Sequence, residues 1–122
     1  MEKKLEVSFM LDFYNKLLTE KQADTLDFYY NQDLSLSEIA EHLAISRQGV
    51  RDSIKRGERL LYELEEKLGL VKRFNSIHDK LALIEKNITA MEVLNAQHIQ
   101  SSALLFNIEE IKRILTEIDE KV

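Results

Sequence analysis

The stretch of residues 35–59, which reads SLSEIAEHLAISRQGVRDSIKRGER, decides the fold of this chain. Ser35 and Glu38 have the spacing of a capping box, in which each side chain bonds a backbone amide at the start of a helix. Only two residues separate Leu43, where that short helix is expected to end, from Ser46, a good N-cap for the next helix. Two helices joined so closely predict a helix-turn-helix.

The apolar residues of this stretch are spaced so that they meet across the turn. They are Ile39, Ala40, Leu43, Ile45, Val50 and Ile54. On a helical wheel the residues of the second helix that face inward are Val50, Ile54, Gly57 and Leu61. This helix is expected to run for about six turns and to end at Gly69, a C′ residue.

The opposite face of the second helix carries the candidate nucleic-acid-binding residues. They are Arg47, Gln48, Arg51, Lys55, Arg56 and Arg59. We expect the first three to meet base edges, because a recognition helix enters the major groove by its N-terminal end, and the last three to meet phosphates. Residues 46–59 sum to +3 in a chain whose net charge is −5, so the basic island is confined to this helix. Asp52 either accepts from cytosine or pairs with Arg56 one turn along.

The segment before this motif predicts two further helices. Residues 3–18 have helical periodicity, with apolar positions at Leu5, Phe9, Leu11, Phe13, Leu17 and Leu18. Thr19 and Gln22 form a second capping box, which starts a helix over residues 20–30. The aromatic run 28–30 at its end could stack on bases but is expected to be core.

Two apolar seams with heptad spacing follow Gly69. The predicted seam residues are Phe74, Ile77, Leu81, Ile84, Ile88 and Met91, then Leu104, Ile108, Ile111, Leu115, Ile118 and Val122. The polar stretch 95–102 interrupts them. The two helices could form a hairpin, pack on the N-terminal half or pair with another chain. A hairpin alone buries little against the cost of ordering ~50 residues, so we expect dimerisation through residues 74–118. The expected domains are a helix-turn-helix over residues 1–69 and amphipathic helices over residues 70–122.

Composition narrows the class of protein. The chain has 122 residues with no cysteine and no proline, which permits long helices and excludes disulfides and thiolate metal sites. No apolar run approaches the ~20 residues of a membrane span and no secretory segment is evident near Met1, so a cytoplasmic location is expected. The isolated glycines make no phosphate loop, and His42, His78 and His98 are scattered, so we expect no cofactor, no metal and no enzyme activity.

Several phrases make the chain resemble a known bacterial family. They are LLTEKQ at residues 17–22, SLSEIAE at residues 35–41, SRQ at residues 46–48 and IKR at residues 54–56. Residues 5–70 resemble the YlxM family and are similar to the helix-turn-helix of sigma factor region 4. The resemblance implies an all-α fold, with a sigma region 4-like or winged-helix-like domain of three to four helices followed by a helical arm or hairpin. Gly49 and Arg51 depart from the alanine and tyrosine of family members.

The resemblance also implies a function. Family members are linked to the signal recognition particle pathway because their genes lie beside that of the particle's GTPase, and a regulatory role is suggested. We expect a non-enzymatic DNA-binding regulator, as a homodimer with half-sites about one duplex turn, ~34 Å, apart. The alternative is an accessory protein that binds the particle's RNA or its GTPase.

Overall fold

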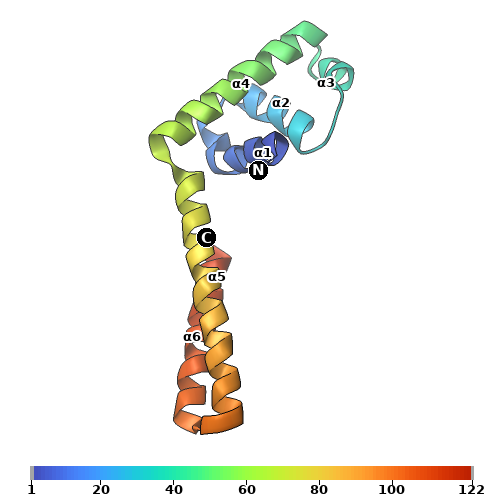
Figure 1. Cartoon of the computed structure of the whole chain (residues 1–122). Coiled ribbons are helices and arrows are strands. Elements are labelled where there is room, and N and C mark those ends of the chain that lie inside the picture. The colour runs from blue at the N-terminus through green and yellow to red at the C-terminus, as the bar shows by residue number, and fades with distance from the viewer. Residues whose placement is uncertain (1, 122) are drawn as a thin grey trace. The chain divides into compact units, whose positions relative to one another are not determined.

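The computed structural model describes residues 2–121, and the side chains of residues 2–119. All regular structure in that range is helical, which confirms the all-α prediction, and no strand or β-wing accompanies the helices there. The elements are α1 (Lys3–Tyr14), η1 (Asn15–Leu17), α2 (Glu20–Tyr30), α3 (Leu36–Leu43), α4 (Arg47–Leu68), α5 (Leu70–Leu94), η2 (Asn95–Ile99) and α6 (Ser102–Lys121). Figure 1 shows their order along the chain.

The chain divides into two compact units, one ending at Lys72 and the other starting at Arg73. The first unit comprises α1 to α4 with the first residues of α5. The second comprises the rest of α5 with η2 and α6.

The first unit closes around one apolar core. Its buried members are Val7, Met10, Leu11, Tyr14, Leu18, Leu26, Tyr30, Ile39, Ala40, Val50, Ile54, Leu61 and Val71. Helix α4 packs against α1, α2 and α3 and so forms the spine of the unit (Figure 1). Gly57 permits the close approach of α4 to α2, because a Cβ at this position would lie 2.8 Å from Leu26 Cδ1.

The first helix differs from its prediction in length and in face. The α-helix ends at Tyr14, and a 3₁₀ turn covers residues 15–17. Leu5 and Leu17, expected on its apolar face, are 53% and 59% exposed. The buried residues of α1 are Val7, Met10, Leu11 and Tyr14, which have the i, i+3, i+4, i+7 spacing of a single helical face.

The predicted helix starts are confirmed. Gln22 N donates to Thr19 Oγ1 over 3.2 Å, and Thr19 N donates to Gln22 Oε1 over 3.4 Å. In the second capping box Glu38 N donates to Ser35 Oγ over 3.1 Å, and Ser35 N donates to Glu38 Oε1 over 3.0 Å. Gly69 ends α4 with φ +62°, a left-handed conformation that glycine adopts without strain.

A polar cluster ties α1 to the junction of α4 and α5. The Tyr14 hydroxyl donates to Glu65 Oε1 over 2.6 Å and accepts from Leu70 N over 3.1 Å. The Glu65 carboxylate also accepts from Val71 N and Lys72 N, over 3.0 and 3.1 Å. Burial raises the pKa of Glu65, but these three hydrogen bonds outweigh burial and hold the pKa below its usual range. The carboxylate therefore caps the free amides at the start of α5.

The second unit is an antiparallel pair of helices, α5 and α6 (Figure 1). Lys112 Nζ lies 3.1 Å from Glu92 Oε2, and His78 Nε2 lies 3.8 Å from Asp119 Oδ1, so the helices face each other at both ends. The buried Asn95 holds the connection, since its amide nitrogen donates to Ser101 O over 3.1 Å and its oxygen accepts from Ser101 N over 2.9 Å. Among the three arrangements left open by the sequence, the chain adopts the hairpin; Val122 lies outside the described residues.

Candidate nucleic-acid interface

The candidate site is the helix-turn-helix formed by α3 and α4. Between them Ala44 adopts a left-handed conformation with φ 55°, and Ile45 N donates to Ala40 O over 3.1 Å. Ser46 then caps α4, as predicted, by accepting from Gly49 N over 2.9 Å. The turn is short because it consists of one left-handed residue and the N-cap region of the next helix.

The inner face of α4 is the predicted one. Val50, Ile54, Gly57 and Leu61 are all buried, and Ser53 is buried beside them. Leu43 and Ile45 pack against this core from α3 and the turn. With these side chains inside, the outer face of α4 is fixed, because a helix cannot turn about its axis without exposing its apolar stripe.

All six candidate nucleic-acid-binding residues are exposed on α4. They are Arg47, Gln48, Arg51, Lys55, Arg56 and Arg59. Within the part of the chain that the structure describes, none of the five cations among them has a carboxylate within 4.0 Å. We call this set the α4 basic face. Its positive charge is left for an external anion.

Asp52 belongs to the same face and has a different partner from the proposed one. Its Oδ1 accepts from Gln48 Nε2 over 3.0 Å, and Arg56 makes no ion pair with it. Gln48 lies four residues before Asp52 and Arg56 lies four residues after it, and the hydrogen bond is made by Gln48. The Gln48 amide is thereby held along α4, with its oxygen still free to accept.

The aromatic run before the helix-turn-helix is only partly core. Tyr30 is buried and Phe28 is half-buried, with its ring stacked on His42 at a centroid distance of 5.2 Å. Tyr29, which the sequence assigned to the core, is 38% exposed. His42 therefore packs on an aromatic ring, and no group of three or more metal-ligating side chains exists among the described residues.

The Glu38 side chain anchors the start of α3 electrostatically. The backbone amide of Ser35 lowers the pKa of this carboxyl most, and the Ser35 hydroxyl lowers it further. A carboxylate at a helix N-terminus is also favoured by the helix dipole.

None of the helices within residues 2–121 combines the length and the apolar character that crossing a membrane requires.

A protein family defined by sequence matches residues 1–102, and its description is "Putative helix-turn-helix protein, YlxM / p13 like". The chain belongs to this family. The match includes the whole α3–α4 motif as well as α5, and agrees with the resemblance carried by residues 5–70. Membership in the YlxM/p13-like family thus supports the helix-turn-helix independently of the geometry.

The matching family is also named UPF0122, and similar proteins from other bacteria carry the name UPF0122 protein. One from Acetivibrio thermocellus is 46% identical over 110 residues, covering 90% of this chain and 93% of the relative. One from Thermoanaerobacter sp. is 45% identical over 115 residues, covering 94% and 95%. A third, from Clostridium kluyveri, is 53% identical over 79 residues, covering 65% and 71%. The first two matches extend over nine tenths of this chain or more, and the names of all three relatives state no ligand.

Proposed function

We propose that the chain is a non-enzymatic regulatory protein that binds duplex DNA through the α4 basic face. The observation that carries the proposal is the set of five exposed cations without a carboxylate partner among the described residues. The chain as a whole has a net charge of −5, so five exposed cations on one face of a single helix are a local concentration of positive charge. Because these five cations lie together and have no carboxylate partner among the described residues, the α4 basic face suits a polyanionic ligand.

The geometry of α4 suggests how the residues divide their roles. Arg47, Gln48 and Arg51 lie in the first turns of the recognition helix, where base edges are read; arginine pairs with guanine and glutamine with adenine. Lys55 and Arg59 lie further along the helix and suit phosphates, which position the protein without reading sequence. Gln48 donates one amide hydrogen to Asp52, so its second amide hydrogen and its oxygen remain for adenine.

The test is the affinity for labelled mixed-sequence duplex DNA at two salt concentrations, measured by fluorescence anisotropy. Each phosphate contact that is removed lowers the slope of log affinity against log salt by about 0.9. We therefore expect the double substitution Arg51→Ala and Lys55→Ala to weaken binding about tenfold or more and to flatten the salt dependence.

The matched control removes the same charge elsewhere on the first unit. Lys16 and Lys21 are exposed and lie outside the α4 basic face. The pair Lys16→Ala and Lys21→Ala should leave the salt slope nearly unchanged. Equal losses in both double variants would mean that only net charge matters and would contradict the proposal.

The second unit is proposed to dimerise through the predicted seam. Among the seam residues whose side chains the structure describes, only Ile88 and Ile108 are buried in the hairpin. Five others remain 37–44% exposed, namely Ile77, Ile84, Met91, Ile111 and Ile118. An open groove of about 450 Å³ runs between the helices, lined in part by Leu81 and Leu115. The hairpin thus leaves much of its seam accessible to water.

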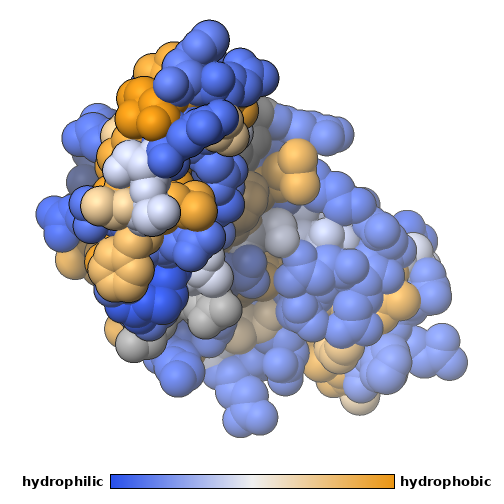
Figure 2. All heavy atoms as spheres, turned by 90° about the horizontal axis from the view of Figure 1, so that it is seen from below, coloured by the Kyte–Doolittle hydropathy of each residue, from blue (hydrophilic) through white to orange (hydrophobic). Residues whose placement is uncertain are grey.

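A second copy of the hairpin supplies the missing apolar cover. Exposed apolar side chains that gather on one face are a common mark of a surface that another protein chain covers. Figure 2, which views the molecule from below with respect to Figure 1, shows apolar patches between hydrophilic ones on the nearest part of the surface. A two-fold dimer would also present two α4 basic faces to successive half-sites of a duplex.

A role with the signal recognition particle is the alternative function. It rests on the family resemblance, on the overall acidity of the chain and on its long apolar seams. Adding the particle's RNA as a competitor in the anisotropy assay separates the two functions. Displacement of duplex DNA by equimolar RNA would favour the accessory role, whereas retained DNA binding favours the regulator.

A further inference from the structure

An open groove of about 590 Å³ lies on the first unit, next to the α4 basic face. It is lined by the N-terminal end of α1, the C-terminal end of α2, the loop before α3, and α4. Its volume falls in the range of ~300–1,000 Å³ that holds small organic groups. The groove shares Arg51 and Lys55 with the α4 basic face, so the two surfaces are continuous.

The charges of the groove leave an uncompensated positive side. Lys3 Nζ lies 3.4 Å from Glu58 Oε2, and Lys4 forms an ion pair with Asp33, so both acidic residues of the lining are neutralised. Arg51 and Lys55 have no such partner within the described part of the chain. The groove therefore offers two cations to an anionic group bound in it.

The rest of the lining is aromatic and aliphatic. Tyr29 is 38% exposed, and its ring meets that of the buried Tyr30 edge-on, at a centroid distance of 5.0 Å and an interplanar angle of 90°. Leu34, Leu36 and Ile54 complete the apolar surface. Because Tyr30 supports one side of Tyr29, the exposed ring is a preformed surface for another flat ring.

We propose that this groove holds an unpaired nucleotide of a nucleic acid bound along α4. The base lies against Tyr29, and the adjoining phosphate lies on Lys55 and on Arg51, which then contacts this phosphate in place of a base edge. The inference rests on the proposed function, since the nucleotide belongs to the strand that the α4 basic face binds. A base that remains stacked in a duplex cannot reach Tyr29, so the groove favours an overhang, a bulge or a single strand.

Continuity of charge favours a nucleotide over a peptide. An acidic peptide with an aromatic side chain would match the same two cations, but it would not account for the basic face running on from the groove to Arg47. A polyanionic strand accounts for both surfaces with one ligand, because its phosphates follow each other at regular intervals.

The experiment compares three fluorescein-labelled DNA probes of one sequence: a blunt duplex, the same duplex with a short 3′ overhang, and the single strand. We expect the overhang to bind the full-length protein about tenfold more tightly than the blunt duplex. Base–aromatic stacking of this kind accounts for factors of about ten or more. The variant Tyr29→Leu should lose that gain and keep the blunt-duplex affinity.

The conservative variant Tyr29→Phe is the matched control. This variant keeps the ring and should still bind the overhang more tightly than the blunt duplex. If both Tyr29→Leu and Tyr29→Phe lose this tighter binding at unchanged thermal stability, the stacking of a base on Tyr29 is overturned. Equal affinity for overhang and blunt duplex, with binding still dependent on Arg51 and Lys55, would overturn the groove proposal and leave the proposed function intact. Failure of all three probes to bind would overturn both.

An acidic peptide containing phenylalanine serves as a competitor. If the peptide displaces the overhang probe only at concentrations that also displace the blunt duplex, the result supports a nucleotide in the groove. Tight binding of the peptide that depends on Tyr29, with no gain from the overhang, would assign the groove to a protein partner and overturn the proposal.

Discussion

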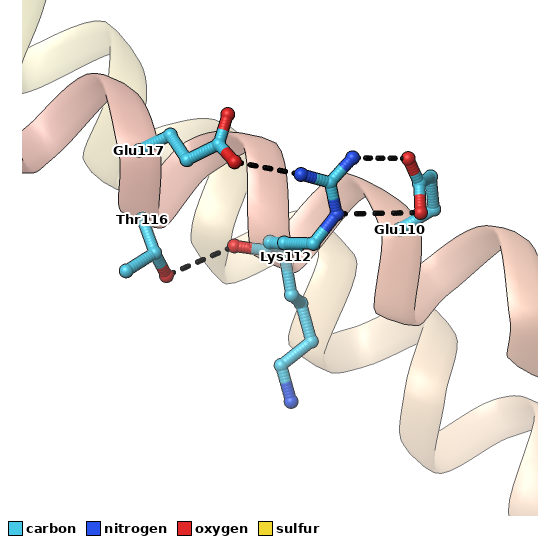
Figure 3. A network of polar contacts seen from close by, with 5 residues as sticks. Glu110, Lys112, Thr116 and Glu117 are labelled. Carbon is cyan, nitrogen blue, oxygen red and sulfur yellow. Dashed lines mark hydrogen bonds and ion pairs between the residues drawn. The ribbon is translucent and has the colours of Figure 1, made fainter.

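The outer faces of α4 and α6 are both rich in charge, yet their cations have different surroundings. On α6 the guanidinium of Arg113 donates to Glu110 and, over 2.6 Å, to Glu117 (Figure 3), and Lys112 lies 3.1 Å from Glu92. On α4 the five cations of the basic face have no carboxylate within 4.0 Å in the described chain. Both helices contain arginine and lysine, but among the described side chains the cations of α6 are paired and those of the α4 basic face are left for a ligand.

Apolar side chains show the reverse distribution. The first unit buries its core residues around α4, whereas the second leaves most of its seam half-exposed. The α4 basic face thus lacks carboxylate partners within the described chain, and many described apolar side chains of the second unit remain exposed. This difference supports two separate ligands, a polyanion for the first unit and a second copy of the chain for the other.

The largest expected effect is on self-association. Introducing two charges into the seam with Met91→Lys and Ile111→Lys should weaken dimerisation about 100-fold or more, because lysine must lose its hydration where the second hairpin packs. Sedimentation equilibrium over a range of concentrations measures the change. The control Leu83→Lys alters an exposed residue outside the predicted seam and should leave the dimer intact. A monomeric parent protein would contradict the dimer at once.

The next effect is on the stability of the first unit. Tyr14→Phe removes the hydroxyl that bonds Glu65 and Leu70, which should lower the free energy of unfolding by about 1–3 kcal/mol. Urea denaturation measures this difference. The neighbouring Glu66 is exposed, and Glu66→Ala should change stability by less than about 0.5 kcal/mol. Equal changes in the free energy of unfolding for the two variants would show that the hydrogen bonds of Tyr14 do not stabilise the first unit.

The same cluster should make stability depend on pH in the acidic range. The folded-state pKa of Glu65 is lowered, so its contribution is fully present above the unfolded pKa of about 4.3 and is lost as pH falls through the folded value. The stability difference between the parent and Glu65→Gln should therefore shrink below about pH 4. Urea denaturation at a series of pH values tests this, and a difference that grows with acidity would contradict it.

Two glycines of α4 provide a smaller, paired contrast. Gly57→Ala places a methyl group 2.8 Å from Leu26 Cδ1 and should destabilise the first unit by about 1–2 kcal/mol, after allowing for the better helix propensity of alanine. Gly49→Ala places its methyl group 3.2 Å from Ser46 Oγ and 3.6 Å from Ile45 Cδ1, which is a looser fit. The higher helix propensity of alanine offsets the strain at the Ser46 cap. The free energy of unfolding, measured by thermal denaturation, should therefore change by less than about 0.5 kcal/mol. Equal losses would argue against the close packing of α2 on α4.

The smallest effect is expected on α6. Arg113→Ala removes an exposed ion-pair network and should change stability by less than about 0.5 kcal/mol. Its affinity for duplex DNA should equal that of the parent protein. A loss of affinity similar to that of Arg51→Ala in the anisotropy assay would remove the distinction between α4 and α6.

Local sequence signals predicted much of the fold. The capping residues Thr19, Ser35 and Ser46 and the terminating Gly69 act on neighbouring backbone groups, so their roles can be inferred from a few residues. The inner face of α4 was equally clear, because its apolar positions repeat over several turns. The first helix was harder, since its apolar residues are too numerous to select one face without knowing what packs on it.

Tertiary contacts account for what the sequence did not predict. The groove on the first unit brings Lys3 and Tyr29 to Arg51, and no pattern of spacing indicates that these distant residues meet. The sequence predicted Arg56 as the partner of Asp52 within the helix, whereas the side-chain geometry pairs Asp52 with Gln48. The α4 basic face could be listed from sequence, but the absence of internal partners among the described residues is a property of the structure.

Chemical-shift mapping tests the central claim most directly. Uniformly ¹⁵N-labelled protein is titrated with a mixed-sequence DNA duplex, and amide shifts are followed along the chain. The account predicts that the largest shifts fall in α4, between Arg47 and Arg59, with little change at Lys112 and Arg113. Shifts concentrated in α6, or no shifts at all at concentrations where anisotropy reports binding, would contradict it.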